Sequence, residues 1–313
     1  CSKEAKLCAR SHTHSMEEIR MRMISILGDF FCDEAASVIG HCAEHALSAE
    51  VCTTPKPGLV DQRNNGSHSD MTIGTFADSI QALSFWFPAF YRAGWACDEP
   101  QQLFHKLRAL GIEAQREMYE VTGGVNTHKG SIFSFAVLCG ALGALQASHR
   151  APCTLSALQE SCRNIAEHSL ADFKATTPDT EGLRCYQEHA LYGARGEAAQ
   201  GFPSAMECAL PALQLWLKRG ADFNRASVAA LLHLIGQIDD MNMIHRGGVL
   251  EARRRRLEAA ELYDILTVDT IIPTATALDE SYIRANLSPG GCADMLAVSL
   301  FLFFVLNEKI VIY

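Results

Sequence analysis

Apolar residues recur at helical spacing along most of the chain, and polar segments separate these stretches. From Ser15 to about Ala49 they follow every third or fourth position, which is typical of a helix with one buried face. The same spacing predicts helices over Thr75–Ala93, Glu99–Val121, Ser131–Gln146, Leu155–Phe173, Ser204–Lys218, Asn224–Ile238, Leu250–Ile265, Val268–Asn286 and Met295–Leu306. Strand-like alternation is confined to the short run Ile310–Tyr313. The pattern therefore predicts an all-α fold of roughly ten helices.

No linker or repeat divides the chain. Residues 1–15 are polar and rich in His and Ser, and we expect them to form a disordered N-terminal extension. Residues 16–313 are predicted to be one globular multi-helix domain. Within it, Pro211 should kink the helix that begins at Ser204, because proline lacks the backbone N–H.

Composition restricts the class of protein. A hydrophobic content of 48% with 20% charged residues is ordinary for a globular chain, and the net charge of −9 argues against a nucleic-acid binder. The 12 cysteines show no CxxC pair and no signal sequence is evident, so we expect reduced thiols and a cytoplasmic location. Asp29 interrupts the apolar run Met21–Phe31, and Met295–Leu306 is shorter than the ~20 residues of a membrane-spanning helix. We therefore predict no membrane segment.

Five polar, glycine-containing loops fall at the ends of the predicted helices. They are VCTTPKPGLVDQRNNGSHSDM (51–71), TGGVNTHKG (122–130), LYGARGEAAQGFP (191–203), QIDDMNMIHRGG (237–248) and LSPGGCAD (287–294). In the first loop, Pro55 and Pro57 exclude a helix, while Gly58 and Gly66 permit left-handed backbone. Loops this rich in polar groups are candidate sites. We expect these glycine-rich loops to converge on one nucleotide-binding cleft.

The loops carry the charges that a phosphorylated ligand needs. Cations stand beside Gly, Pro or Asn turns at Lys56, Arg63, Lys129, Arg195 and Arg246. Cations near helix starts bind phosphate, although any one of them alone could be a surface charge. The acids are Glu50, Asp61, Asp70, Glu197, Asp239, Asp240 and Asp294. Carboxylates beside bound phosphates commonly hold Mg²⁺, but the Asp239–Asp240 pair could equally be part of a helix-capping turn.

A competing motif lies in the first long helix. His41-Cys42-Ala43-Glu44-His45 fits H-x-x-E-H, the inverted zinc-peptidase signature. Two histidines one turn apart could share a zinc ion, with a third ligand from Glu113, Glu117 or Glu120. This interpretation leaves all five glycine loops unexplained. The P-loop, the dinucleotide-binding and the nucleophile-elbow patterns are all missing from the sequence.

Taken together, the loops resemble the triphosphoribosyl-dephospho-CoA synthase family. The matching segments are TTPKPGLVDQRNNGSHSDM (53–71), TGGVNTHKG (122–130), GARGEAAQGFPSA (193–205), the DxxNxxxRGG frame at Asp239–Gly248, and NLSPGGCADMLA (286–297). Five motifs in the same order make the resemblance specific. It implies an all-α catalytic domain with ATP and dephospho-CoA as substrates and Mg²⁺ as the expected cofactor.

The reaction that the resemblance implies joins the two nucleotides. The 2′-hydroxyl of the dephospho-CoA ribose attacks C1 of the ATP ribose, and adenine leaves while the triphosphate stays attached. The product is the prosthetic-group precursor for citrate lyase, passed to a downstream transferase and then to the acyl carrier protein. A sister branch serves malonate decarboxylase with the same product, and a nucleotide-binding module without turnover is the alternative from another class.

Residue roles within this resemblance are hypotheses. The candidates for catalysis are Glu197, His68, His128 and Asp61, the first three as proton acceptors. The candidates for substrate and phosphate binding are Lys56, Arg63, Asn65, Gly123, Gly124, Asn126, Lys129, Arg195, Arg246 and Gly247. The candidates for metal binding are Asp239, Asp70 and Asp294, with Asp240 the weaker choice beside Asp239. An oligomer is possible.

Overall fold

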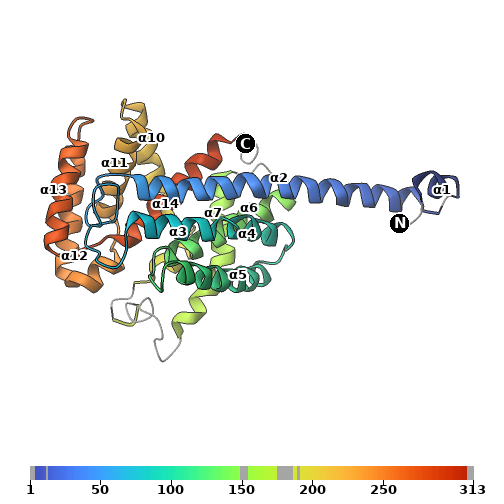
Figure 1. Cartoon of the computed structure of the whole chain (residues 1–313), viewed down its shortest axis with the longest axis horizontal. Helices are drawn as coiled ribbons and strands as arrows, with labels where there is room; N and C mark the ends of the chain where they lie inside the picture. The colour runs from blue at the N-terminus through green and yellow to red at the C-terminus, as the bar shows by residue number, and fades with distance from the viewer. Residues whose placement is uncertain (1–3, 12, 149–153, 175–185, 189–190, 309–313) are drawn as a thin grey trace.

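The computed structural model describes residues 4–11, 13–148, 154–174, 186–188 and 191–308. Within these ranges the chain is helical and has no strand (Figure 1), which confirms the all-α prediction. The elements are α1 (Ala5–Arg10), α2 (Met16–Cys52), α3 (Ile73–Leu83), α4 (Trp86–Trp95), α5 (Pro100–Val121), α6 (Lys129–Ser148), α7 (Leu155–Ala166), the 3₁₀ helix η1 (Glu167–Lys174), α9 (Gly193–Ala199), the π-helical turn η2 (Ser204–Ala209), α10 (Leu210–Lys218), α11 (Phe223–Gln237), α12 (Met241–Asp264), α13 (Ile271–Arg284) and α14 (Gly290–Asn307). The β-like run Ile310–Tyr313 lies outside the described residues.

Two predicted helices are divided where proline removes a donor. The range Thr75–Ala93 holds α3 and α4, because Pro88 in the first turn of α4 cannot donate to the carbonyl of Ser84. The range Ser204–Lys218 begins with the π-helical turn η2 and continues as α10, with Pro211 in the first turn of α10. The kink predicted at Pro211 is therefore a change of helix type.

Some segments predicted to be irregular are helical. The third loop contains α9, and most of the fourth loop forms the start of α12, whose helical dihedrals stop at Gly248 (φ 79°) before the helix continues. The N-terminal extension also differs from the prediction, because its described part contains the short helix α1.

The core is built around α6 and α14. Both helices are apolar on nearly all sides and contribute buried residues along most of their length. Glycines bring α4 close to α6, because a Cβ added to Gly94 would lie 1.9 Å from the carbonyl oxygen of Gly140. By length and composition α6 and α14 could each cross a membrane, but most of each is buried inside the fold, as in the central helix of a globular domain.

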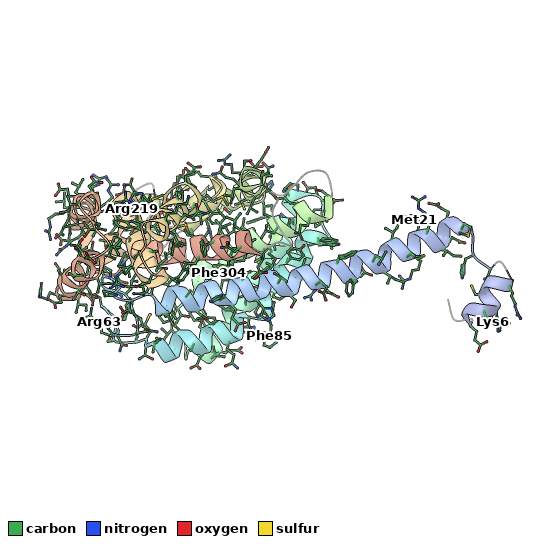
Figure 2. The ribbon with its side chains drawn as sticks, turned by 90° about the horizontal axis from the view of Figure 1, so that it is seen from above. Lys6, Met21, Arg63, Phe85, Arg219 and Phe304 are labelled. Carbon is green, nitrogen blue, oxygen red and sulfur yellow. The ribbon has the colours of Figure 1, made fainter. Side chains whose placement is uncertain are left out.

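The helix α2 has two unlike halves. From Cys32 to Val51 it contributes buried side chains to the core. From Met16 to Phe31 it extends beyond the body of the molecule toward α1 (Figure 2). A capping box of Ser15 and Glu18 provides hydrogen-bond acceptors for free backbone N–H groups at the start of this projecting half.

Candidate active site

A pocket of about 960 Å³ lies where the starts of α6, α9, α12 and α14 meet. Residues from all five glycine-containing loops line it. Its volume is at the upper end of the ~300–1,000 Å³ that is usual for small-molecule sites. Ten of the predicted site residues belong to the lining, namely Lys56, His68, Asn126, His128, Lys129, Arg195, Glu197, Asp239, Arg246 and Asp294.

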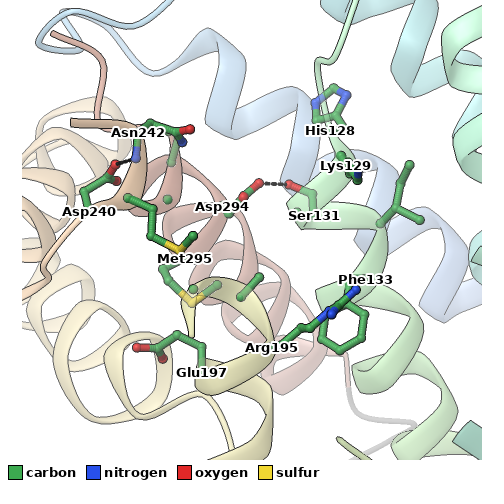
Figure 3. Close-up of a pocket in the computed structure, with 18 of the residues that line it drawn as sticks. His128, Lys129, Ser131, Phe133, Arg195, Glu197, Asp240, Asn242, Asp294 and Met295 are labelled. Carbon is green, nitrogen blue, oxygen red and sulfur yellow. Dashed lines mark hydrogen bonds between the residues drawn. The ribbon is translucent and has the colours of Figure 1, made fainter. Parts of the chain in front are cut away.

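The start of α6 forms one wall of this pocket. The Oδ1 atom of Asn126 accepts a hydrogen bond from the backbone N–H of Lys129 at 3.2 Å. The Lys129 ammonium has no carboxylate partner among the residues that the structure describes, and it lies beside the positive end of the α6 dipole (Figure 3). This wall has the chemistry of a phosphate subsite.

Asp294 reaches the same helix start from α14. Its Oδ1 accepts a short hydrogen bond from the Ser131 hydroxyl (Figure 3). A Cβ added to Gly130 would lie 2.0 Å from Asp294 Oδ2, so glycine is required at position 130 for this approach. Burial raises the pKa of Asp294 to about 7, with a smaller contribution from the Glu50 charge. Asp294 can therefore hold a proton near neutral pH.

A buried ion pair lies behind this wall. Lys56 Nζ is 2.5 Å from Glu50 Oε1, and both side chains are almost completely buried. Lys56 lines the pocket as predicted, but its charge is neutralised by Glu50 rather than left for a phosphate. The pair holds the end of α2 against the first loop.

His128 is not suited to the predicted role of proton acceptor. Burial, and then the Lys56 charge, lowers the pKa of His128 to about 3. Its Nδ1 is 2.7 Å from Ser79 Oγ, which already accepts a hydrogen bond from Thr127 Oγ1 at 2.8 Å. Nδ1 is therefore engaged with Ser79 within a buried chain of hydrogen bonds. A pKa this low makes the imidazole a weak base near neutral pH.

His68 is similarly engaged on both sides of its ring. Nε2 lies 2.8 Å from Ser288 Oγ, and the Arg246 guanidinium donates to Nδ1 at 3.3 Å. Burial and the Arg246 charge lower the pKa of His68. Arg246 also donates to the Ser67 carbonyl at 2.7 Å, so it connects α12 to the first loop. These contacts give both residues a role in holding the pocket wall.

Glu197 is the remaining predicted catalytic group. It lies on α9, its Oε1 accepts a 2.5 Å hydrogen bond from the Ser204 hydroxyl, and its Oε2 accepts from the Ser204 backbone N–H. Burial raises the pKa of Glu197, although the Ser204 hydrogen bonds oppose this. Figure 3 shows Glu197 and Arg195 on the same short helix, below Asp294. A carboxylate with a raised pKa and no cationic partner suits proton transfer.

The two neighbouring aspartates of the fourth loop have different roles. Asp240 is fully buried; its Oδ1 accepts from the N–H groups of Asn242 and Met243, and its Oδ2 from that of Cys292 at 2.9 Å. It therefore caps α12 and ties it to α14. Asp239 is partly exposed in the pocket and pairs with Arg256 at 2.8 Å. Asp239 is thus the better candidate of the two for a metal.

Seven predicted residues lie outside the pocket lining: Asp61, Arg63, Asn65, Asp70, Gly123, Gly124 and Gly247. Asp61 is the clearest correction, because its carboxylate accepts hydrogen bonds from Thr54 Oγ1 and from the N–H groups of Lys56, Arg63 and Asn64. This organises the first loop and leaves no lone pair directed at a substrate. Arg63 instead donates to Thr276, and Asp70 is largely exposed on the loop.

The zinc-peptidase interpretation fails on geometry. His45 stacks on Phe304 with ring centroids 4.1 Å apart, and His41 contacts the carbonyl of Ser37. No group of three His, Cys, Asp or Glu residues in the described part of the chain could hold a metal ion by itself.

The sequence placed Glu50 among the loop acids without a partner for it, and it did not single out Ser131 or Ser204. Ser131 and Ser204 each hydrogen-bond a pocket carboxylate, and Glu50 neutralises Lys56. The one available signal was position, because Ser131 and Ser204 directly follow two of the glycine loops.

Comparison with known proteins identifies the family. Residues 36–310 match the CitG family, described as ATP:dephospho-CoA triphosphoribosyl transferase. A 2-(5''-triphosphoribosyl)-3'-dephosphocoenzyme-A synthase of Pectobacterium atrosepticum is 40% identical over 276 residues, which cover 84% of this chain and 88% of the relative. A Haemophilus ducreyi protein of the same name is 32% identical over 331 residues, covering 98% and 99%. No solved structure matches this chain. The chain therefore belongs to the ATP:dephospho-CoA triphosphoribosyl transferase family.

Proposed function

We propose that this protein transfers the triphosphoribosyl group of ATP to the 2′-hydroxyl of dephospho-CoA and releases adenine. The observation that carries the proposal is the convergence of five motif loops on one pocket that contains Lys129 at a helix start and two carboxyl groups with raised pKa values. A pocket of about 960 Å³ offers room for extended nucleotide ligands.

In this proposal Lys129 and Arg195 bind the triphosphate. Lys129 adds its charge to the start of α6. Arg195 lies on α9, and its side chain lies beside Phe133, one turn after Lys129 on α6 (Figure 3). Cations from two helices that meet at one wall can hold a long polyanion through several of its phosphates.

Glu197 and Asp294 divide the proton transfers. As the 2′-oxygen bonds to C1 of the ATP ribose, its proton passes to the Glu197 carboxylate. The bond from C1 to adenine breaks with its electron pair going to the base, and protonated Asp294 donates a proton to the leaving adenine. Raised pKa values suit both groups to proton transfer near neutral pH. The negative pocket carboxylates also stabilise positive charge that develops on the ribose ring.

The residues present fit Mg²⁺ as a shared ligand of protein and substrate. Mg²⁺ usually takes one or two carboxylates and completes its shell with phosphate oxygens and water. Asp239 lines the pocket and is partly exposed, so it would hold the ion. Bound there, Mg²⁺ would neutralise part of the triphosphate charge.

The product would serve as the precursor of the citrate lyase prosthetic group, which a downstream transferase delivers to the acyl carrier protein. We place this activity in the cytoplasm, where both nucleotides are available. The malonate decarboxylase branch would use the same chemistry and differ in the acceptor protein.

The test is to incubate the purified protein with ATP, Mg²⁺ and dephospho-CoA while measuring free adenine and the product mass. We expect adenine only when both substrates are present, together with a triphosphoribosyl adduct of dephospho-CoA. Release of ADP, AMP or pyrophosphate instead would contradict the proposal. Tight ATP binding without turnover would favour a nucleotide-binding module.

A further inference from the structure

The projecting half of α2 is apolar and exposed. Of the 16 residues from Met16 to Phe31, nine are large apolar residues. All nine are between 42% and 80% exposed: Met16, Ile19, Met21, Met23, Ile24, Ile26, Leu27, Phe30 and Phe31. The segment precedes residues 36–310, which match the family. An apolar surface of this extent marks an interaction site.

Five of these residues form a continuous seam with the spacing of a coiled coil. Met16, Ile19, Met23, Ile26 and Phe30 follow one another at intervals of three and four residues. This is the a/d pattern of two heptads. We call these five residues the α2 seam. Arg22 and Asp29 both occupy g positions beside it, and neither forms an ion pair with another described residue.

We infer that the α2 seam pairs in antiparallel orientation with the α2 seam of a second copy of this chain. With Met23 facing Ile26 of the second copy, Ile19 faces Phe30, and every seam layer from Ile19 to Phe30 is apolar. In an antiparallel pair the g positions face each other, so Arg22 of each copy lies beside Asp29 of the other. The two charges that have no ion-pair partner in the described part of one chain are thereby paired twice.

The alternative parallel pairing is disfavoured by charge and by shape. It places Asp29 beside Glu34 of the second copy, which is a repulsive contact between like charges. It also brings both bodies to the same end of the seam, because α2 enters the body at Cys32 (Figure 2). The antiparallel pair separates the bodies at opposite ends. A seam of two heptads makes a small interface, and specific interfaces usually bury ~1,200 Å² or more in total.

The test is sedimentation velocity of the whole chain across a concentration series, with two matched variants. Ile26 and Ile24 are each 53% exposed on the same helix, but only Ile26 belongs to the α2 seam. We expect the wild type to form a dimer, Ile26→Glu to weaken it at least tenfold, and Ile24→Glu to leave it dimeric. Circular dichroism of both variants checks that they fold.

A charge exchange tests the orientation. Arg22→Glu alone and Asp29→Arg alone should each weaken the dimer, and the double variant should restore it. The concentration series should rise in 100-fold steps to ~100 μM, a micromolar range in which small interfaces still associate. A wild type that stays monomeric at every one of these concentrations would overturn the inference. So would equal effects of the two isoleucine variants. Binding of monomers to phospholipid vesicles, lost equally in both variants, would assign the segment to a membrane surface instead.

Discussion

The pocket wall and the projecting half of α2 both reverse the usual distribution of side chains. The wall buries Glu50, Lys56, His128 and Asp240 to within a few per cent of zero exposure. The projecting half exposes nine large apolar side chains to water. Buried charges and extended exposed apolar surface are the informative exceptions to ordinary burial.

The two exceptions are stabilised differently. In the pocket, each buried charge has a specific partner, such as Glu50 for Lys56 and three backbone N–H groups for Asp240. On α2, the exposed residues do not belong to the buried core of the described residues, and in the inference above a second copy of the chain covers them. Buried charges with specific partners indicate a binding or catalytic site. An extended exposed apolar surface indicates a site of interaction with another molecule.

The largest expected effect is on turnover when Lys129 is changed. Lys129→Ala should lower kcat/KM at least ~10³-fold, about 4 kcal/mol of transition-state stabilisation, because it removes a triphosphate contact. The unfolding midpoint should stay the same, since the exposed Lys129 side chain has no ion-pair partner among the described residues. Lys106→Ala removes the same charge from the exposed face of α5 and is the control. Equal losses in both variants would contradict a specific phosphate site.

The buried ion pair should dominate stability. Glu50→Gln leaves the Lys56 ammonium buried without a counter-charge, which should cost ~3–5 kcal/mol in urea unfolding. The double variant Glu50→Gln/Lys56→Met should recover most of this loss. Glu113→Gln, which breaks an exposed pair with Arg116, should cost under ~1 kcal/mol. Similar costs for the buried and the exposed pair would remove the distinction drawn between them.

Asp294 should make both stability and rate depend on pH. Its pKa is about 7 in the folded protein against 3.8 for an ordinary aspartate, so the folded state holds a proton that the unfolded state has lost between these values. Its contribution to stability is therefore complete below pH ~4 and falls as pH rises toward 7, by up to ~4 kcal/mol. Asp294→Asn should lack this slope, so the difference in unfolding free energy between wild type and variant should vary with pH in this range.

The same group should set the alkaline limb of the rate profile. If Asp294 donates a proton to adenine, kcat/KM should fall above pH ~7 and the variant should be slow at every pH. Ser131→Ala, which removes the hydroxyl that favours ionised Asp294, should move this limb to higher pH. A profile that stays in place in Ser131→Ala would argue against Asp294 as the acid.

The smallest effect is expected on the projecting half of α2. Met23→Ala should change the unfolding free energy of the dilute monomer by under ~0.5 kcal/mol, because the side chain is 58% exposed. Leu296→Ala, at a fully buried position of α14, should cost ~2–5 kcal/mol. A large cost at Met23 would mean that the projecting half is already packed within one chain.

The helical pattern and the five motif loops were visible in the sequence because both are local. Apolar spacing predicts where α2, α5 and α11 run, and proline and glycine predict where helices cannot continue. Lys129 and Glu197 could be named as candidate site residues because they lie within motif loops. Asp61 was predicted to be catalytic because, in the sequence, it looks like any acid near a glycine. The sequence does not show that its carboxylate accepts hydrogen bonds from its own loop.

By itself the sequence determined the all-α class, the order of the loops and the family to which they belong. The tertiary structure alone decided which loop groups meet. Ser131 and Asp294 are 163 positions apart, and Asp240 and Cys292 are 52 apart. Such pairings depend on how the helices pack. Burial then raises the pKa of Asp294, and packing brings Lys56 into an ion pair with Glu50. Local propensity contains no information about either, because both are properties of the assembled core.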